Sequence, residues 1–222
     1  MSFDVRRPGS PTGFDVRRPG PPAGFDVAVQ LTRGDARIGA AFATGPGVTV
    51  LFGRSGVGKT TILNMVAGLI RPDKGHVRVG GRTLFDRNAA VDLAPERRRA
   101  GYVFQDARLF PHRRVRANLL YGARDDARLA ETAAMLDVAH LLDRWPRTLS
   151  GGEARRVAIG RALLSDPDFL LLDEPLASLD AVRAEEVMRT LERLRDGTRL
   201  PMLLVTHDAD EAERLGNHLV RL

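Results

Sequence analysis

The chain has 222 residues, 43% of them hydrophobic, which is enough for one sizeable core with at most a small appended lobe. It has no cysteine, which excludes disulfides, thiolate metal sites and a cysteine nucleophile and suits a reducing compartment. The net charge of +6 would suit a surface that binds nucleic acid. The arginines stand among acidic residues without interleaved aromatics, however, so we expect no nucleic-acid partner.

The first residues carry a repeat. Phe-Asp-Val begins at Phe3, again at Phe14 and again at Phe25, and the linking residues are rich in Pro, Gly and Arg. We expect residues 1–23 to be a disordered tail, with an arm that touches lipid or a partner as the alternative. This N-terminus lacks the apolar region of a secretory signal, and no stretch of the chain approaches the roughly 20 apolar residues that span a bilayer. Any membrane-spanning part is therefore expected in another chain.

From Gly24 the pattern becomes globular, and we assign residues 24–222 to one domain. Alternating apolar residues predict two pairing strands, 25–31 and 37–43, around the turn at Gly34-Asp35. Further strands are predicted at 48–52, 76–79, 101–104, 169–172 and 202–205, with helices from 61 to about 70 and from 181 to about 195, and a last short helix and strand. Strands that alternate with helices predict an α/β fold with a largely parallel sheet. Residues of about 106–165 are mostly helical in pattern and predict an inserted helical subdomain.

Residues 53–60 read G-R-S-G-V-G-K-T and stand between a predicted strand and a predicted helix, which is the context of a phosphate-binding loop. Its glycines let backbone N–H groups turn toward phosphate oxygens, and the helix N-terminus adds partial positive charge. Lys59 supplies charge for the β- and γ-phosphates, and the Thr60 hydroxyl is a ligand for Mg²⁺. The loop predicts a binder of a nucleoside triphosphate, with contacts from Gly53, Arg54, Ser55, Gly56, Val57, Gly58, Lys59, Thr60 and Thr61.

Two acidic residues close the predicted strand 169–172. The carboxyl ends of parallel strands line the crevice where α/β sheets bind ligands, so Asp173 and Glu174 are expected beside the phosphate loop. Asp173 is the predicted Mg²⁺ carboxylate, and Glu174 the predicted base that polarises the attacking water. The alternative is an acidic surface pair that follows a core strand.

Two further polar residues follow predicted strands. His207 comes after the apolar strand 202–205 and is predicted to orient the water at the γ-phosphate, with a satisfied histidine at a strand end as the alternative. Gln105 follows the strand 101–104, and its amide is predicted to bind both Mg²⁺ and the water. Together, Gln105, Glu174 and His207 are the predicted catalytic residues, and Thr60, Gln105 and Asp173 the predicted metal ligands.

Residues 149–153 read L-S-G-G-E, in which Ser150 and Glu153 have the spacing of a helix capping box. A well-capped helix is the simplest interpretation. Gly151 and Gly152 also expose bare N–H groups at a positive helix end, which predicts a second anion site. One nucleotide cannot easily use both sites of one monomer. We therefore predict a head-to-tail homodimer in which Ser150, Gly151 and Gly152 cover the γ-phosphate held by the partner's Lys59, with two ATP molecules in an isologous interface.

With these elements the chain resembles the ATP-binding cassette (ABC) family over residues 24–222. The family's phosphate loop, glutamine loop at Gln105, signature at 149–153, acidic strand end at 173–174, D-loop at Ser178-Leu179-Asp180 and switch histidine at His207 appear in family order. The resemblance implies ATP hydrolysis with Glu174 as the base. It also implies that Asp180 helps to couple the two nucleotide sites across the dimer.

A closer resemblance links the chain to the ATPases of molybdate importers, carried by G-Y-V-F-Q-D-A-R-L-F-P-H at 101–112 and V-A-I-G-R-A-L at 157–163. It implies a peripheral subunit at the cytoplasmic face of the inner membrane that powers a separate permease for molybdate or tungstate. A coupling helix of the permease would dock after Gln105, and a periplasmic or extracellular oxyanion-binding protein would act indirectly. Another solute such as sulfate, or a non-transport cassette, is the alternative.

The sequence departs from this pattern in two places. Many cassettes stack adenine on an aromatic residue after the first strand, but between Val27 and Gly47 the only aromatic is Phe42. Molybdate-importer ATPases usually continue into a C-terminal oxyanion-binding regulatory domain, whereas this sequence stops at Leu222. We expect either a short form without that domain or an incomplete chain.

Overall fold

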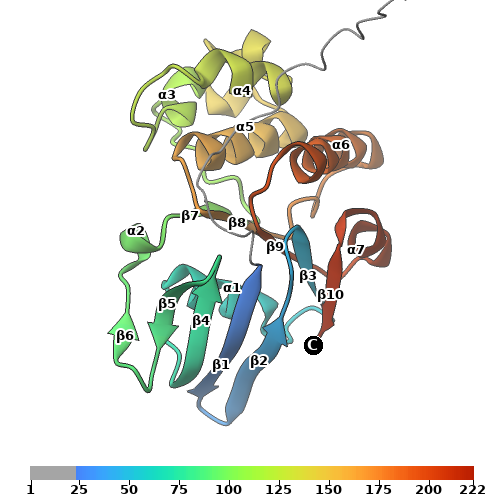
Figure 1. The fold of residues 1–222 in the computed structure, drawn as a ribbon. Coiled ribbons are helices and arrows are strands. Elements are labelled where there is room, and N and C mark those ends of the chain that lie inside the picture. The colour runs from blue at the N-terminus through green and yellow to red at the C-terminus, as the bar shows by residue number, and fades with distance from the viewer. Residues whose placement is uncertain (1–23) are drawn as a thin grey trace, which may run out of the picture.

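The computed structural model describes residues 24–222, so the predicted disordered tail, residues 1–23, lies outside the described residues. The described chain forms two five-stranded sheets and a layer of helices (Figure 1). The antiparallel sheet has the order β2-β1-β4-β5-β6 and consists of β1 (Phe25–Arg33), β2 (Ala36–Ala43), β4 (Lys74–Val79), β5 (Arg82–Asp86) and β6 (Val91–Asp92). The parallel sheet has the order β10-β3-β9-β8-β7 and consists of β3 (Val48–Phe52), β7 (Ala100–Val103), β8 (Phe169–Asp173), β9 (Met202–Thr206) and β10 (His218–Arg221).

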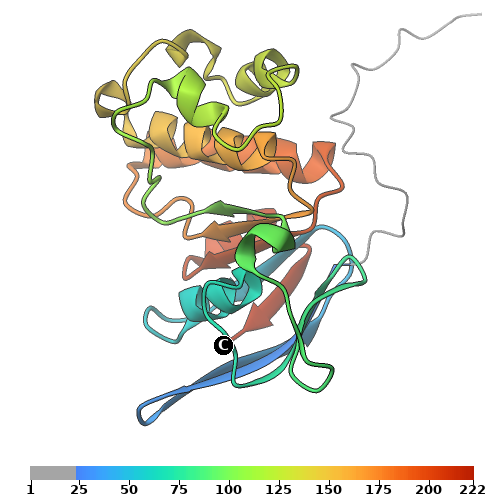
Figure 2. The ribbon, with the colours of Figure 1, turned by 90° about the vertical axis from the view of Figure 1, so that its left-hand side faces the viewer.

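Helices cover both faces of the parallel sheet. Figure 2 shows the helical layer on one side of this sheet, and α1 with the antiparallel sheet on the other. The helices are α1 (Lys59–Ala67), α2 (Pro95–Arg98), α3 (Val115–Leu119), α4 (Leu129–Met135), α5 (Gly151–Leu164), α6 (Ala181–Gly197) and α7 (Ala209–Leu215). Among residues 24–222, no helix combines the length and the apolar character needed to cross a lipid bilayer.

The parallel strands are apolar on both faces because both faces are buried. In β8, Leu172 belongs to the core under the helical layer, whereas Leu171 belongs to the core around α1. Leu204 and Leu203 of β9 divide in the same way, and the register pairs Leu172 with Leu204 and Leu171 with Leu203. The two cores explain why the sequence shows continuous apolar runs here rather than alternation.

The predicted α/β fold with an N-terminal antiparallel part is confirmed, and two local predictions need correction. β5, β6 and α2 were not predicted, although Gly80-Gly81, both with positive φ, is the signature of a tight hairpin between β4 and β5. The first helix was predicted over 61 to about 70 but covers 59–67. It ends at Gly68, whose φ of 83° is left-handed, so the glycine rather than Pro72 stops the helix.

Arg98 of α2 holds the C-terminal end of α1. Its side chain is 1% exposed, and its Nη1 donates to the carbonyls of Met65 (2.9 Å) and Val66 (3.0 Å). Its Nη2 lies 3.1 Å from an oxygen of Asp92, and its Nε donates to the Leu93 carbonyl. The guanidinium therefore supplies a donor to the Val66 carbonyl and a second donor to the Met65 carbonyl, which also accepts from the Gly68 N–H at 3.2 Å. This contact fixes the helix that begins with the phosphate loop.

Arg98→Leu is expected to destabilise the protein by about 2–3 kcal/mol, because it removes the side-chain donor of the Val66 and Leu93 carbonyls. Urea unfolding followed by circular dichroism measures the change. Arg97→Leu, an exposed neighbour on the same helix, is the control and is expected to change the free energy of unfolding by less than about 0.5 kcal/mol. Equal stability of the Arg98 and Arg97 variants would contradict the assigned role.

Candidate active site

The phosphate loop joins the end of β3 to the start of α1 and depends on glycine at two positions. Gly56 has φ 82° and Gly58 has φ 103°, a region that favours glycine. A Cβ at Gly58 would lie 2.6 Å from Cγ2 of Ile38, so the loop also packs closely against β2. The rim of the loop, residues 54–57, is exposed, and its floor at Gly53 is buried. The glycine conformations and this packing thus fix the course of the loop backbone, with its rim open to solvent.

Lys59 points back into this loop. Its side chain is 4% exposed, and Nζ donates to the carbonyls of Gly53 (2.7 Å) and Arg54 (3.0 Å). Nζ also lies 3.9 Å from Oε1 of Glu174. The ammonium is therefore placed between the loop and the predicted base, where the β- and γ-phosphates of a nucleotide would lie.

Thr60 and Asp173 meet across the two adjoining elements. The Thr60 hydroxyl donates to Oδ1 of Asp173 at 2.9 Å, although the two residues are far apart in sequence. Asp173 is 4% exposed; burial raises its pKa, the Thr60 hydrogen bond opposes this, and the charge of Glu174 adds to it. A hydroxyl and a carboxylate are the oxygen donors that suit Mg²⁺, which usually completes its shell with water and phosphate oxygens. Within residues 24–222 no cluster of three or more His, Cys, Asp or Glu residues offers a ready-made metal cage.

Asp173→Asn is expected to stabilise the nucleotide-free protein by about 1 kcal/mol while it weakens Mg²⁺-dependent nucleotide binding. Because the fold raises the pKa of this buried carboxyl, its charged form costs stability at neutral pH, and asparagine removes that charge but keeps an acceptor for Thr60. Thermal unfolding without nucleotide measures the gain. Asp35→Asn, an exposed turn position, is the control and is expected to have no effect. A lower melting temperature for Asp173→Asn would contradict this prediction.

Glu174 and His207 form a pair beside Lys59. Oε1 of Glu174 lies 3.3 Å from Nδ1 of His207, with the glutamate side chain 16% exposed and the histidine 53% exposed. The backbone of Glu174 has φ 45°, a strained value for a non-glycine residue, and its N–H donates to the Val205 carbonyl at 3.0 Å. The strand end therefore turns the carboxylate toward Lys59 and His207 rather than toward solvent.

Gln105 lies beyond the same edge of the sheet but is not joined to the other site residues. β7 pairs with β8 through Val103 and Leu172, so the residues after Val103 and after Leu172 emerge side by side. The Gln105 side chain is exposed. No hydrogen bond within residues 24–222 links it to Thr60 or Asp173. Of the predicted catalytic and metal residues, the structure brings together Thr60, Asp173, Glu174 and His207, and leaves Gln105 outside this group.

The predicted second anion site lies in the helical layer, at the start of α5. The capping box is present: Glu153 N–H donates to Ser150 Oγ (3.2 Å) and Ser150 N–H to Glu153 Oε2 (2.6 Å), and the latter bond lowers the pKa of Glu153. A Cβ at Gly151 would lie 2.8 Å from Cδ2 of Leu179, so the signature packs against the D-loop of its own chain. Asp180 in turn caps α6 (its Oδ1 accepts from Arg183 N–H at 3.0 Å).

No hydrogen bond or ion pair between the described residues joins the start of α5 to Lys59. The fold thus places the two predicted anion sites apart, one at the start of α1 and the other in the helical layer at the start of α5. The one aromatic residue between Val27 and Gly47, Phe42, lies on β2. Phe42 is paired with Val27 and packs, partly buried, against the core around α1, and residues 31–38 contain no aromatic side chain.

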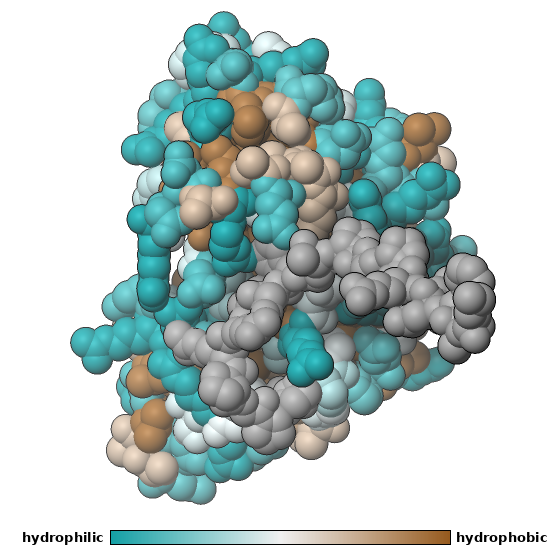
Figure 3. All heavy atoms as spheres, turned by 45° about the horizontal axis from the view of Figure 1, so that its top comes forward, coloured by the Kyte–Doolittle hydropathy of each residue, from teal (hydrophilic) through white to brown (hydrophobic). Residues whose placement is uncertain are grey.

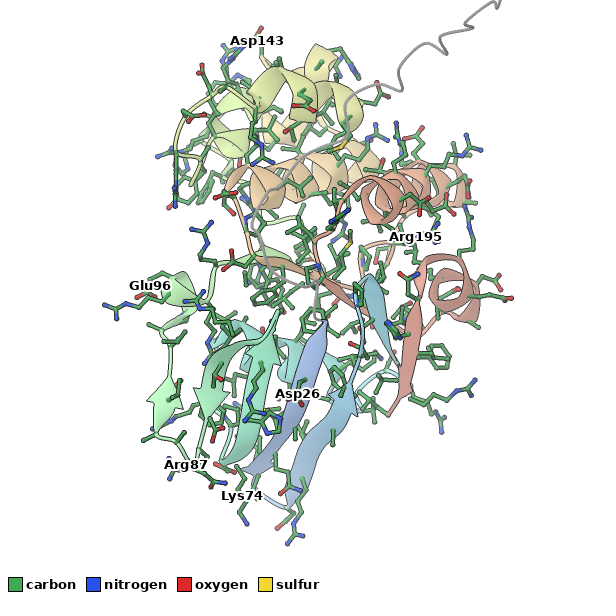
Figure 4. The ribbon with its side chains drawn as sticks, in the orientation of Figure 1. Asp26, Lys74, Arg87, Glu96, Asp143 and Arg195 are labelled. Carbon is green, nitrogen blue, oxygen red and sulfur yellow. The ribbon has the colours of Figure 1, made fainter. Side chains whose placement is uncertain are left out.

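Other charged residues have local partners away from the site. His76 Nε2 lies 2.9 Å and Arg78 Nη1 lies 3.1 Å from the carboxylate of Asp26, which lies on the antiparallel sheet (Figure 4). Arg195 forms an ion pair with Asp196 and contacts the carbonyl of Arg214 between α6 and α7 (Figure 4). These groups stabilise the surface of the fold and carry no part of the site.

The segment after Gln105 forms an ordered, partly aromatic surface. Asn118, fully buried, accepts from Phe110 N–H (2.7 Å) and donates to the carbonyls of Phe110, Arg113 and Arg114. The Phe110 ring lies 4.3 Å from the Tyr121 ring, and the Arg113 guanidinium lies over both rings. Figure 3 shows that the helical layer is otherwise mostly hydrophilic, with small apolar areas between polar side chains.

Sequence reasoning missed two residues of α5 that contact the glutamine loop. Arg155 Nη1 donates to the Phe104 carbonyl (2.7 Å), and the two terminal nitrogens of Arg161 donate to the carbonyls of Ala107 (3.0 Å) and Arg108 (2.8 Å). The available signal was the presence of arginines in a helix whose other residues after 154 are almost all apolar. Such arginines are either exposed or bound to something inside the fold.

The sequence of this chain is similar to a family model and to many curated proteins. The ABC transporter family model matches residues 42–177, more than half of the chain. Among curated relatives, the Molybdenum import ATP-binding protein ModC of Brucella melitensis is 53% identical over 201 residues, covering 88% of this chain and 56% of that protein. ModC of Rhizobium meliloti is 50% identical, covering 87% and 56%. The chain thus spans about half the length of the curated relatives it matches.

The fold is also similar to those of solved ATP-binding cassettes. The ATP-binding cassette MJ0796, described as a dimer in a post-hydrolysis state bound to ADP and Pi, is 27% identical with a TM-score of 0.67 and covers 89% of this chain and 92% of its own. CbiO1 from Clostridium perfringens, part of the ABC transporter complex cbiONQ, is 25% identical with a TM-score of 0.77 and covers 90% and 84%. The phosphate loop, the acidic strand end, the capped signature helix and these matches lead to one assignment: the chain belongs to the ABC transporter family.

Proposed function

We propose that the protein is the ATP-hydrolysing subunit of an importer for molybdate or tungstate. The observation that carries the ATPase proposal is the convergence of Lys59, Thr60, Asp173 and Glu174 at one edge of the parallel sheet. The substrate rests on relatives named as molybdenum import proteins and about half identical to this chain. Import of sulfate or another solute, and a non-transport cassette, are the competing outcomes of the test below.

The residues divide the reaction among them. The loop N–H groups and Lys59 would bind the phosphates, with Arg54, Ser55, Val57 and Thr61 as further loop contacts. Thr60 and Asp173, joined later by Gln105, would hold Mg²⁺, which when bound neutralises charge on the β- and γ-phosphates. Glu174 would accept the proton of the attacking water, and His207, 3.3 Å away, would hold that carboxylate and the water in line.

We also propose that the active form is a head-to-tail homodimer. Lys59 and the start of α5 are two anion-binding features of one chain, with no contact between them. In a head-to-tail dimer, the start of α5 of one copy can lie against the Lys59 site of the other. Ser150, Gly151 and Gly152 would cover the γ-phosphate bound by the partner, and Asp180, next to the signature, would link the two sites. Sedimentation of the Glu174→Gln protein with and without MgATP tests this; a monomer under both conditions would exclude ATP-driven dimerisation.

The membrane partner is proposed to dock on the surface formed by Phe110, Arg113 and Tyr121. This surface directly follows Gln105, combines aromatic rings with cationic groups, and is held rigid by Asn118. The protein would then lie peripherally on the cytoplasmic face of the inner membrane. A periplasmic or extracellular oxyanion-binding protein would deliver cargo to the permease without touching this chain.

The deciding experiment is reconstitution of the protein with its co-purified permease in proteoliposomes. We expect ATPase activity to rise several-fold when the binding protein loaded with molybdate or tungstate is added, and to stay at the basal rate with the sulfate-loaded protein. Stimulation by the sulfate-loaded protein alone would show that the cargo is sulfate, while the proposal that the protein powers an importer would stand. Absence of any membrane partner, together with hydrolysis, would favour a non-transport cassette.

A further inference from the structure

The helix that begins with the signature also grips the loop that contains Gln105. Arg155 lies one turn into α5, is 5% exposed, and donates from Nη1 to the carbonyl of Phe104, the residue before Gln105. Arg161, two turns further, donates to the carbonyls of Ala107 and Arg108. Two arginines of one helix thus hold the main chain on both sides of Gln105 and Asp106.

The held loop has a defined internal structure. Arg108 has φ 46°, an unfavourable left-handed value for this residue type, and its guanidinium lies 4.0 Å from the centre of the Phe104 ring. The Phe104 ring stacks in turn on Tyr102 at 4.1 Å, and the Tyr102 hydroxyl donates to Asn64 of α1. The loop therefore closes on itself between its two arginine contacts, and Gln105 and Asp106, which lie between those contacts, are exposed.

Arg155 forms no ion pair among the described residues; burial lowers its pKa, and the charges of Asp106 and Asp173 oppose that shift. Its Nε is buried without a hydrogen-bond partner, and its one bond within residues 24–222 is the bond to the Phe104 carbonyl. Burying a guanidinium with one hydrogen bond is costly, and the nearby charges of Asp106 in the glutamine loop and of Asp173 at the strand end offset part of that cost. The next residue, Arg156, is equally buried and its Nε also lacks a partner, but it pairs with Glu186 at 2.6 Å and has no bond to the loop.

We propose that Arg155 is a positioning residue that makes the glutamine loop move with the signature helix. Because a rigid donor in α5 fixes the carbonyl before Gln105, the position of the Gln105 backbone follows the helical layer rather than the sheet edge at Asp173. Rotation of the helical layer, which would bring the signature to a partner's γ-phosphate, then also delivers Gln105 to the metal centre. The inference rests on the proposed ATPase function. It assigns Arg155 a role in determining when Gln105 reaches the metal centre.

The test compares Arg155→Met with the matched control Arg156→Met. We expect Arg155→Met to lower kcat at saturating MgATP at least tenfold with KM for ATP within twofold, because nucleotide binding depends on α1 and not on this loop. Arg156→Met is expected to keep kcat within threefold even if its melting temperature falls. Arg155→Lys, which retains one donor, is expected to recover at least half of the wild-type kcat.

Equal losses of kcat in Arg155→Met and Arg156→Met would reduce Arg155 to a structural residue, as would equal losses in its Met and Lys variants. A test without substitution of Arg155 uses hydrogen exchange of the Glu174→Gln protein. Added MgATP is expected to protect the amides of residues 105–109 and of the first turn of α5 by the same factor, and independent changes would overturn the proposal. Lack of MgATP binding or hydrolysis by the wild-type protein would instead contradict the proposed function, so the two failures are distinguishable.

Discussion

Lys59→Ala is expected to weaken MgATP binding by roughly 1000-fold, which corresponds to about 4 kcal/mol. The ammonium is nearly fully buried and is held by two loop carbonyls, so it is already oriented toward the place of the β- and γ-phosphates. Its removal deletes charge-assisted hydrogen bonds to phosphate, each worth about 1.5–3 kcal/mol, with no other lysine nearby. Isothermal titration with ATP in the presence of Mg²⁺ measures the loss.

The chain supplies its own control, because Lys74 is its only other lysine. Lys74 lies at the start of β4 at the end of the antiparallel sheet (Figure 4) and is exposed. Lys74→Ala should bind MgATP as the wild type does. Acetylation with an amine reagent gives a second readout: MgATP should protect Lys59 and leave the labelling of Lys74 unchanged. Undiminished binding by Lys59→Ala would remove the phosphate-loop assignment.

Glu174→Gln is expected to lower kcat by about 1000-fold while MgATP affinity stays within threefold of the wild type. The carboxylate faces His207 at 3.3 Å and Lys59 at 3.9 Å, and the strained backbone at φ 45° turns it toward them. Glutamine keeps the shape and most contacts but accepts no proton from water. Hydrolysis should therefore stop after binding, and a closed, ATP-bound dimer should accumulate. Single-turnover kinetics and size-exclusion chromatography with MgATP measure the two effects.

Glu211 is the matched control for this substitution. It is another buried acid close to His207; burial raises its pKa, and it accepts a hydrogen bond from Thr206 at 2.7 Å. Its contacts serve the strand end and the cap of α7 rather than the phosphate loop. Glu211→Gln should therefore keep kcat within threefold. If Glu211→Gln abolished turnover and Glu174→Gln did not, the base would have to be reassigned.

The local chemistry of the site could be read from the chain. The glycine pattern around Lys59, the apolar run before Asp173 and the S-x-x-E spacing at Ser150 each depend on backbone rules that act over a few residues. The largely parallel sheet was also accessible, because continuous apolar runs mark strands that are buried on both faces. For this reason the α/β fold and the capping box were predicted correctly.

Short elements and long-range contacts were less accessible. β5 and β6 contain few residues each, and their pairing in a separate antiparallel sheet depends on β1 and β4, which lie far away in sequence. The role of Arg98 depends on carbonyls more than 30 residues earlier, with sequence separations of 32 and 33. Such contacts have no local signal, because an arginine in sequence gives no indication of the carbonyl that it will meet.

The sequence by itself predicted two anion-binding helix starts and an acidic strand end, since each of these is a property of neighbouring residues. Only the tertiary structure decided which of them meet. It joined Thr60 to Asp173 and Glu174 to His207, left Gln105 outside that group, and tied the glutamine loop to α5 through Arg155 and Arg161. The physical reason is that hydrogen bonds and ion pairs act over a few ångströms, and only the packing of sheets and helices brings distant residues within that range.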